Sequence, residues 1–174
     1  LVEFPDRLKT EIDYFCERLH APTFTDQQFE AITHGLSREI AVYRALRRAG
    51  YNVRMTSRVQ DAMGIDMVIT DPDTKKSINV DVKTHSAFHF RLVDLERQSR
   101  IDEERRLECE LAGFCKVRNG HGQQAVDTVL LRVATEHLGE IRNFDFVDME
   151  PLVTLVSDAL QHEGRYIIAL NDYE

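Results

Sequence analysis

The chain has 174 residues, of which 43% are hydrophobic and 30% are charged, and its formal net charge is −8. This length supports one domain with a sizeable core, and no apolar run approaches the roughly 20 residues of a membrane-spanning helix. The charged N-terminal stretch lacks the apolar segment of a signal peptide, so we expect a cytoplasmic protein without membrane contact.

The three cysteines, Cys16, Cys109 and Cys115, are odd in number, widely spaced and contain no CxxC pair. This pattern argues against a disulfide framework, a zinc ribbon and a four-cysteine iron–sulfur site. We therefore expect three reduced thiols.

The first fifty residues predict three helices. Residues 6–20 carry apolar side chains at helical spacing and form the first. Residues 25–35 predict a second helix that begins at Thr25 as N-cap and stops at Gly35. Ser37 is expected to cap a third helix over residues 38–50, which Gly50 ends.

The pattern changes to strands at Tyr51. Strands are expected over residues 51–58, 64–71 and 77–84, and the turn formers of residues 71–76 join the last two into a hairpin. A charged helix over 92–113, a strand over 128–134, a helix over 151–162 and a strand over 165–170 follow. This order predicts one α/β domain over residues 1–174 with a mixed central sheet flanked by helices. It divides into an N-terminal helical extension (1–35), a core (36–133) and a C-terminal helix and strand (134–174).

Charged side chains stand inside two of these strands. Because side chains alternate along a strand, Asp81 and Lys83 share the face opposite Val80 and Val82. Asp66 lies within the neighbouring apolar strand, and normal hairpin pairing would bring it within reach of the ion that Asp81 could bind. Two close carboxylates repel each other unless one protonates or a cation neutralises them. Mg²⁺, with Mn²⁺ as a substitute, is the hard cation that such oxygen ligands favour.

Asp66, followed after fourteen residues by Asp81-Val82-Lys83, resembles the PD-(D/E)xK nuclease superfamily, whose members have a restriction-endonuclease-like fold. The segments SREIAVYRALRRAGYNV and GIDMVI are similar to the same core in archaeal Holliday-junction resolvases and Mrr-type restriction enzymes. The resemblance covers residues 36–95. Ile65 replaces the proline of the motif, and the literal pair Pro72-Asp73 falls in the predicted turn, where its carboxylate would lie in water.

The resemblance implies a Mg²⁺-dependent endonuclease that hydrolyses DNA phosphodiesters, with a restriction, repair, junction-cutting or mobile-element role. Asp66 and Asp81 would hold the metal with the backbone carbonyl of Val82, and Glu39 would complete the site or bind a second ion. Lys83 would orient or deprotonate the attacking water, or stabilise charge on phosphorus. A homodimer that cuts both strands is a further implication. The candidate phosphate contacts are Arg44, Arg47, Arg48, Lys75 and Lys76.

Other interpretations remain open at this stage. Taken alone, Glu39 among arginines fits a surface ion-pair partner, and Lys83 fits a structural partner of Asp81. The chain could also be a catalytically inactive nucleic-acid-binding or assembly protein on the same fold. An acidic adaptor would explain the net charge, but it leaves two charged residues in a core strand without an account. His85 and His89 stay outside the catalytic set.

Overall fold

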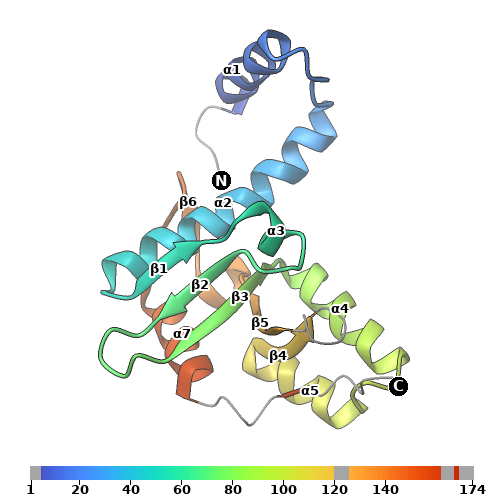
Figure 1. Cartoon of the computed structure of the whole chain (residues 1–174), viewed down its shortest axis with the longest axis vertical. Helices are drawn as coiled ribbons and strands as arrows, with labels where there is room; N and C mark the ends of the chain where they lie inside the picture. The colour runs from blue at the N-terminus through green and yellow to red at the C-terminus, as the bar shows by residue number, and fades with distance from the viewer. Residues whose placement is uncertain (1–4, 120–125, 162–166, 169–174) are drawn as a thin grey trace.

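The computed structural model describes residues 5–119, 126–161 and 167–168. Its centre is one mixed sheet of six strands in the order β1-β2-β3-β5-β4-β8, and a separate two-stranded pair, β6–β7, lies beside it (Figure 1). The strands are β1 (Asn52–Met55), β2 (Met67–Thr70), β3 (Ser77–Lys83), β4 (Phe114–Asn119), β5 (Val126–Arg132), β6 (Ile141–Arg142), β7 (Asp145–Phe146) and β8 (Ile167–Ile168). The expectation of an α/β fold with a mixed sheet is therefore confirmed.

Helices cover both faces of this sheet. They are α1 (Pro5–Arg18), α2 (Asp26–Arg48), α3 (Arg58–Asp61), α4 (His85–Arg97), α5 (Glu103–Ala112), α6 (Thr135–Leu138) and α7 (Glu150–Gln161). The larger core joins α2 and α7 to one face, where Leu46, Met67 and Leu152 are buried. The smaller core joins α4 and α5 to the other face, where Phe88, Leu92 and Leu130 are buried. Among the described residues, β4 and β5 contribute buried apolar side chains to both cores, whereas β1, β2 and β3 contribute them only to the larger core.

The predicted β2–β3 hairpin is confirmed. The two strands are antiparallel, with Met67 opposite Val80 and Thr70 opposite Ser77. In the turn, the Asp71 N–H donates to the Lys76 carbonyl at 2.9 Å, and the Asp71 carboxylate accepts from the Asp73 N–H at 2.9 Å. Asp73 is exposed there, as expected for an aspartate at a hairpin tip.

The predicted break between the second and third helices is wrong. α2 is continuous, and its N-cap is Thr25, whose side chain accepts from the Gln28 N–H in a capping box. The buried residues Phe29, Thr33, Ser37 and Ala41 follow one another at intervals of four. One buried stripe therefore continues along the helix past the position of Gly35. Packing along this stripe outweighs the helix-breaking tendency of a single glycine, and Ser37 is a buried mid-helix residue rather than a cap.

The predicted charged helix over residues 92–113 is also wrong in its extent. Thr84 caps a helix that begins earlier, at His85, and Asp102 caps a second helix, α5. Ser99, at a positive φ of 56°, marks the break between them. The residues between the two helices include no glycine or proline, so the sequence did not indicate a break there. Gly113 ends α5 as expected. β4, which follows at once, was not predicted.

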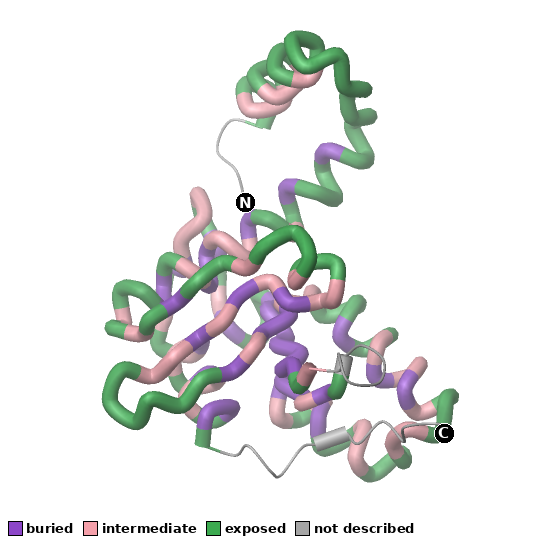
Figure 2. Tube along the Cα trace, in the orientation of Figure 1, coloured by how far each residue is buried: buried purple, intermediate pink, exposed green. Residues whose placement is uncertain are grey.

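The N-terminal part of the chain projects away from the sheet (Figures 1 and 2). Within the described residues, α1 buries no side chain, and Phe15 and Leu19 are 58% and 76% exposed. α1 was predicted as an amphipathic helix, and its apolar stripe is half-buried at best. The expected domain boundary after residue 35 falls inside α2.

Part of one predicted element lies outside the described residues. The last predicted strand overlaps β8 at Ile167–Ile168, and its remainder lies outside them. The cysteines are free thiols, as expected. Cys109 and Cys115 are both fully buried, and their Sγ atoms lie 2.9 Å apart.

Candidate active site

The hairpin brings the side chains of Asp66 and Asp81 together. The β2–β3 ladder begins with Met67 opposite Val80, and Asp66 directly precedes it, where its N–H donates to the Val80 carbonyl at 2.9 Å. The side chains of Asp66 and Asp81 interact, and each carboxyl group shifts the pKa of the other. Both residues lie at the end of the hairpin distant from its turn.

Asp66 is held by the backbone of β3. Its Oδ2 accepts from the Val82 N–H at 2.7 Å. In a strand, the N–H and C=O of one residue point the same way, so the Val82 carbonyl is directed to the same side as Asp66. The Lys83 carbonyl points the other way, where it accepts from the Val133 N–H at 2.8 Å. By strand geometry the Val82 carbonyl is directed toward the side of Asp66, and its role as a metal ligand stays a prediction.

Lys83 forms an ion pair with the second carboxylate. Its Nζ lies 2.6 Å from Asp81 Oδ1, and the side chains of Lys83 and Asp81 are 30% and 7% exposed. Burying Asp81 costs free energy that this ammonium offsets. The side chain of Lys83 is itself only partly exposed.

Glu39 of α2 belongs to the same electrostatic cluster, although it lies on a different element. Burial, together with the charges of Asp66, Asp61 and Asp81, raises the pKa of Glu39 to about 7, while Lys83 opposes the rise. Glu39 therefore lies within electrostatic reach of the other three residues predicted for the site. We call the four residues, Glu39, Asp66, Asp81 and Lys83, the acidic cluster.

The two aspartates are also perturbed. Burial raises the pKa of Asp81 to about 6, against the opposing charge of Lys83, and the Asp66 carboxylate adds to the rise. Burial likewise raises the pKa of Asp66, while its hydrogen bond from the Val82 N–H opposes the rise. Three carboxyl groups with raised pKa values in one place are typical of functional sites and of sites that favour a cation or a proton.

Sequence reasoning missed two charged neighbours of the cluster. Asp61, the last residue of α3, raises the pKa values of Glu39 and Asp66. Arg91 of α4 lowers the pKa of Asp81. Only Arg91 had a signal that could have been found, because it lies two turns into a helix that directly follows Lys83.

Comparison of the chain with family models, curated proteins and solved structures gave no match. The assignment of a function therefore depends on the geometry of the acidic cluster and on the resemblance of its motif.

Among the described residues, no group of three or more His, Cys, Asp or Glu side chains is arranged to hold a metal ion. Near Asp66, the oxygen-bearing groups that a cation could use are the carboxylates of Asp66 and Asp81 and a neighbouring backbone carbonyl. Mg²⁺ is commonly held by one or two carboxylates, with water and phosphate oxygens completing its shell. The residues present fit such a site, and a direct ligand role for Glu39 remains a prediction.

The five predicted phosphate contacts lie in two places. Arg44 and Arg48 of α2 both form ion pairs with Asp145 of β7, at 2.8 and 2.9 Å. Their charge is thus partly neutralised within the chain. Arg47 is exposed on the same helix, and Lys75 and Lys76 lie in the β2–β3 turn, at the end of the hairpin distant from Asp66. A role in nucleic-acid binding stays a prediction for all five.

The two histidines left outside the site have partners of their own. His89 Nδ1 lies 2.7 Å from Glu110 Oε1, which ties α4 to α5. His85 stacks on His137, with ring centroids 6.0 Å apart. Neither histidine has an observed contact with the acidic cluster within the described part of the chain.

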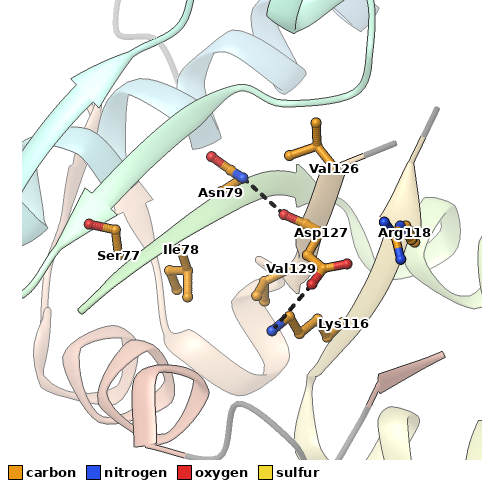
Figure 3. A pocket seen from close by; sticks show the side chains of 8 residues that line it. All are labelled: Ser77, Ile78, Asn79, Lys116, Arg118, Val126, Asp127 and Val129. Carbon is orange, nitrogen blue, oxygen red and sulfur yellow. Dashed lines mark hydrogen bonds and ion pairs between the residues drawn. The ribbon is translucent and has the colours of Figure 1, made fainter. Parts of the chain in front are cut away.

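A cavity of about 420 Å³ lies at the other end of β3 (Figure 3). Asp127 lines this cavity and contacts two other lining residues. Its carboxylate lies 3.8 Å from Lys116 Nζ, and its carbonyl accepts from Asn79 Nδ2 at 2.9 Å. Lys116 and Asn79 are therefore each bonded to Asp127, and none of the residues that line this cavity belongs to the acidic cluster. The chemistry of the cluster makes it the better candidate site.

The helices within the described ranges include none that is long and apolar enough to span a membrane.

Proposed function

We propose that this chain is a Mg²⁺-dependent endonuclease of the PD-(D/E)xK type that hydrolyses DNA. The observation that supports it most strongly is the approach of the Asp66 side chain to Asp81 at the end of the hairpin, with Lys83 bonded to Asp81. The resemblance implies that these three residues act together, and this arrangement fits that implication. The proposal includes a restriction-endonuclease-like core over residues 36–133, of which residues 36–95 carry the resemblance.

The acidic cluster suits a divalent cation. Asp66 and Asp81 would hold the ion together with the Val82 carbonyl, and Glu39 would bind through water or serve a second ion. When bound, Mg²⁺ polarises the scissile phosphate and lowers the pKa of its coordinated water.

The residues of the chain have separate roles in this proposal. Lys83 carries a positive charge beside the carboxylates, where it orients the attacking water or stabilises charge that develops on phosphorus. Glu39, with a pKa of about 7, can accept or hold a proton near neutral pH. Arg91, whose charge lowers the pKa of Asp81, would contact a phosphate bound beside the cluster.

The second candidate function is a catalytically inactive nucleic-acid-binding or assembly protein on the same fold. Two observations favour it. Lys83 is already bonded to Asp81, as a structural ion pair would be. The described residues also lack a three-residue metal group.

A plasmid-nicking assay distinguishes these functions. We expect wild-type protein to nick supercoiled DNA in Mg²⁺ and to lose this activity in EDTA. Asp66→Asn and Lys83→Ala should each lower the rate by at least about 100-fold, because each removes charge that the reaction requires.

Asp73→Asn is the matched control, because Asp73 belongs to the literal Pro-Asp pair yet is exposed in the turn. It should nick at the wild-type rate. Nicking that survives in Asp66→Asn, or cleavage of no duplex, junction or single strand by the wild type, would reject the nuclease in favour of the binding protein.

A further inference from the structure

Cys109 and Cys115 are held on opposite sides of a fixed chain reversal. Cys109 lies on α5 and Cys115 on β4, and Gly113 ends the helix between them with a φ of 77°. The Gly113 N–H donates to the Cys109 carbonyl at 2.9 Å. A side chain at position 113 would be strained at this φ, so glycine fixes the path by which β4 returns beside α5.

The two thiols meet inside the smaller core. Both side chains are fully buried, and the Sγ atoms are 2.9 Å apart. A disulfide requires about 2.05 Å between the sulfur atoms, so bond formation needs a movement of about 1 Å. Because the two residues lie on a helix and a strand joined by a tight turn, the backbone itself brings the sulfur atoms together.

We propose that Cys109 and Cys115 form a disulfide site, which closes into an intramolecular bond when the chain folds in the presence of a low-molecular-weight disulfide such as oxidised glutathione. One protein thiolate attacks the glutathione disulfide and releases one glutathione thiol. The second protein thiolate then attacks the mixed disulfide and releases the other. The two cysteines are oxidised, one glutathione disulfide is reduced to two thiols, and the two cysteine protons go to those thiols.

The bond forms most readily before the core closes. Contact with Cys109 and burial raise the pKa of Cys115 above its ordinary value, so the native chain contains few thiolates at this position. Exchange therefore occurs during folding or when the end of α5 opens. For the same reason, a completed bond resists reductants unless the protein is unfolded.

A closed disulfide would stabilise the smaller core by a covalent cross-link. It joins α5 to β4 beside the point where Arg132 Nη1 donates to the Glu110 carbonyl at 2.8 Å. The cross-link restricts the unfolded chain, so the oxidised protein should melt about 5 °C above the reduced protein.

The test refolds the full chain from denaturant at a series of ratios of reduced to oxidised glutathione. Each sample is acid-quenched, unfolded, treated with N-ethylmaleimide and weighed by intact mass spectrometry. The reduced chain has three thiols to label, whereas the oxidised chain should keep one label, on Cys16. Cleavage after Glu110 by a glutamate-specific protease should leave the Cys109 and Cys115 peptides linked.

Two variants control the assignment. Cys16→Ser should still close the bond and take up no label after oxidation. The double variant Cys109→Ala/Cys115→Ala should carry one label at every ratio, and its melting temperature should not depend on the ratio. The proposal is overturned if the wild type keeps three labels at every glutathione ratio, or if the bridge contains Cys16. Both results come from the wild-type chain and do not depend on how the variants fold.

Discussion

The carboxyl group of Glu39 is half-buried on α2, and three other carboxylates influence it. Its ordinary pKa of 4.5 rises to about 7 in the folded chain. Between these values, the folded chain holds a proton that the unfolded chain has lost. The free energy of unfolding therefore falls as the pH rises from about 4.5 to 7. The pKa of Asp81 rises from 3.8 to about 6 on folding. It therefore also lowers the free energy of unfolding as the pH rises through this range.

Glu39→Gln should remove the larger part of this pH dependence, because a neutral amide carries no charge to bury. After allowance for solvent screening at a half-exposed site, we expect the variant to be about 1 kcal/mol more stable than the wild type at pH 8. The two proteins should match at pH 4. Urea unfolding in EDTA across this range measures the difference. Glu30→Gln, which changes an exposed glutamate of the same helix, should follow the wild type. If the free energy of unfolding of Glu39→Gln depends on pH in the same way as that of the wild type, the raised pKa of Glu39 is contradicted.

Local patterns predicted some elements and not others, for physical reasons. The β2–β3 hairpin was predictable because alternation and turn chemistry agree at Asp71 and its neighbours. The hairpin also brings Asp66 to the β3 backbone beside Asp81, as the two predicted strands implied. The continuity of α2 was not predictable, because tertiary packing at Ser37 overrides the signal of Gly35. Asp61 was also missed, since its approach to the cluster depends on the unpredicted helix α3.

Gly35→Ala tests the continuous helix. Among the described residues, no atom lies within 4 Å of a Cβ added at position 35, and its φ is not positive. Alanine costs up to about 1 kcal/mol less than glycine in a helix, so amide hydrogens of residues 26–37 should exchange up to about fivefold more slowly. Gly113→Ala should do the opposite and destabilise the chain, because its φ is 77°. Faster exchange in Gly35→Ala would indicate that the helix is interrupted there.

At the scale of the whole molecule, a net charge of −8 repels nucleic acid, so binding must depend on local basic surfaces. Two of the predicted arginines are bonded to Asp145, which leaves the hairpin tip as the part of the predicted surface most open to solvent. This arrangement makes the contribution of Lys75 and Lys76 measurable on its own. Each phosphate contact adds about 0.9 to the slope of log affinity against log salt concentration.

The double variant Lys75→Ala/Lys76→Ala should lower that slope by about 2 if both lysines contact phosphates. Fluorescence anisotropy with duplex DNA, in Ca²⁺ to prevent cleavage, measures the affinity between 50 and 200 mM salt. Arg142→Ala, which removes an exposed cation outside the predicted set, is the control. An unchanged slope in the double variant would remove the hairpin tip from the binding surface.

The pairing of Asp66 with Asp81 has a consequence for the folding route. Only a short loop separates the two strands, and hairpins of this kind close within microseconds, well before distant segments dock. The aspartates therefore meet first in open water, where a dielectric constant near 80 makes their repulsion small. The cost arises later, when the packing layers exclude solvent. Uptake of a proton or a divalent cation at that late step would speed the completion of the fold.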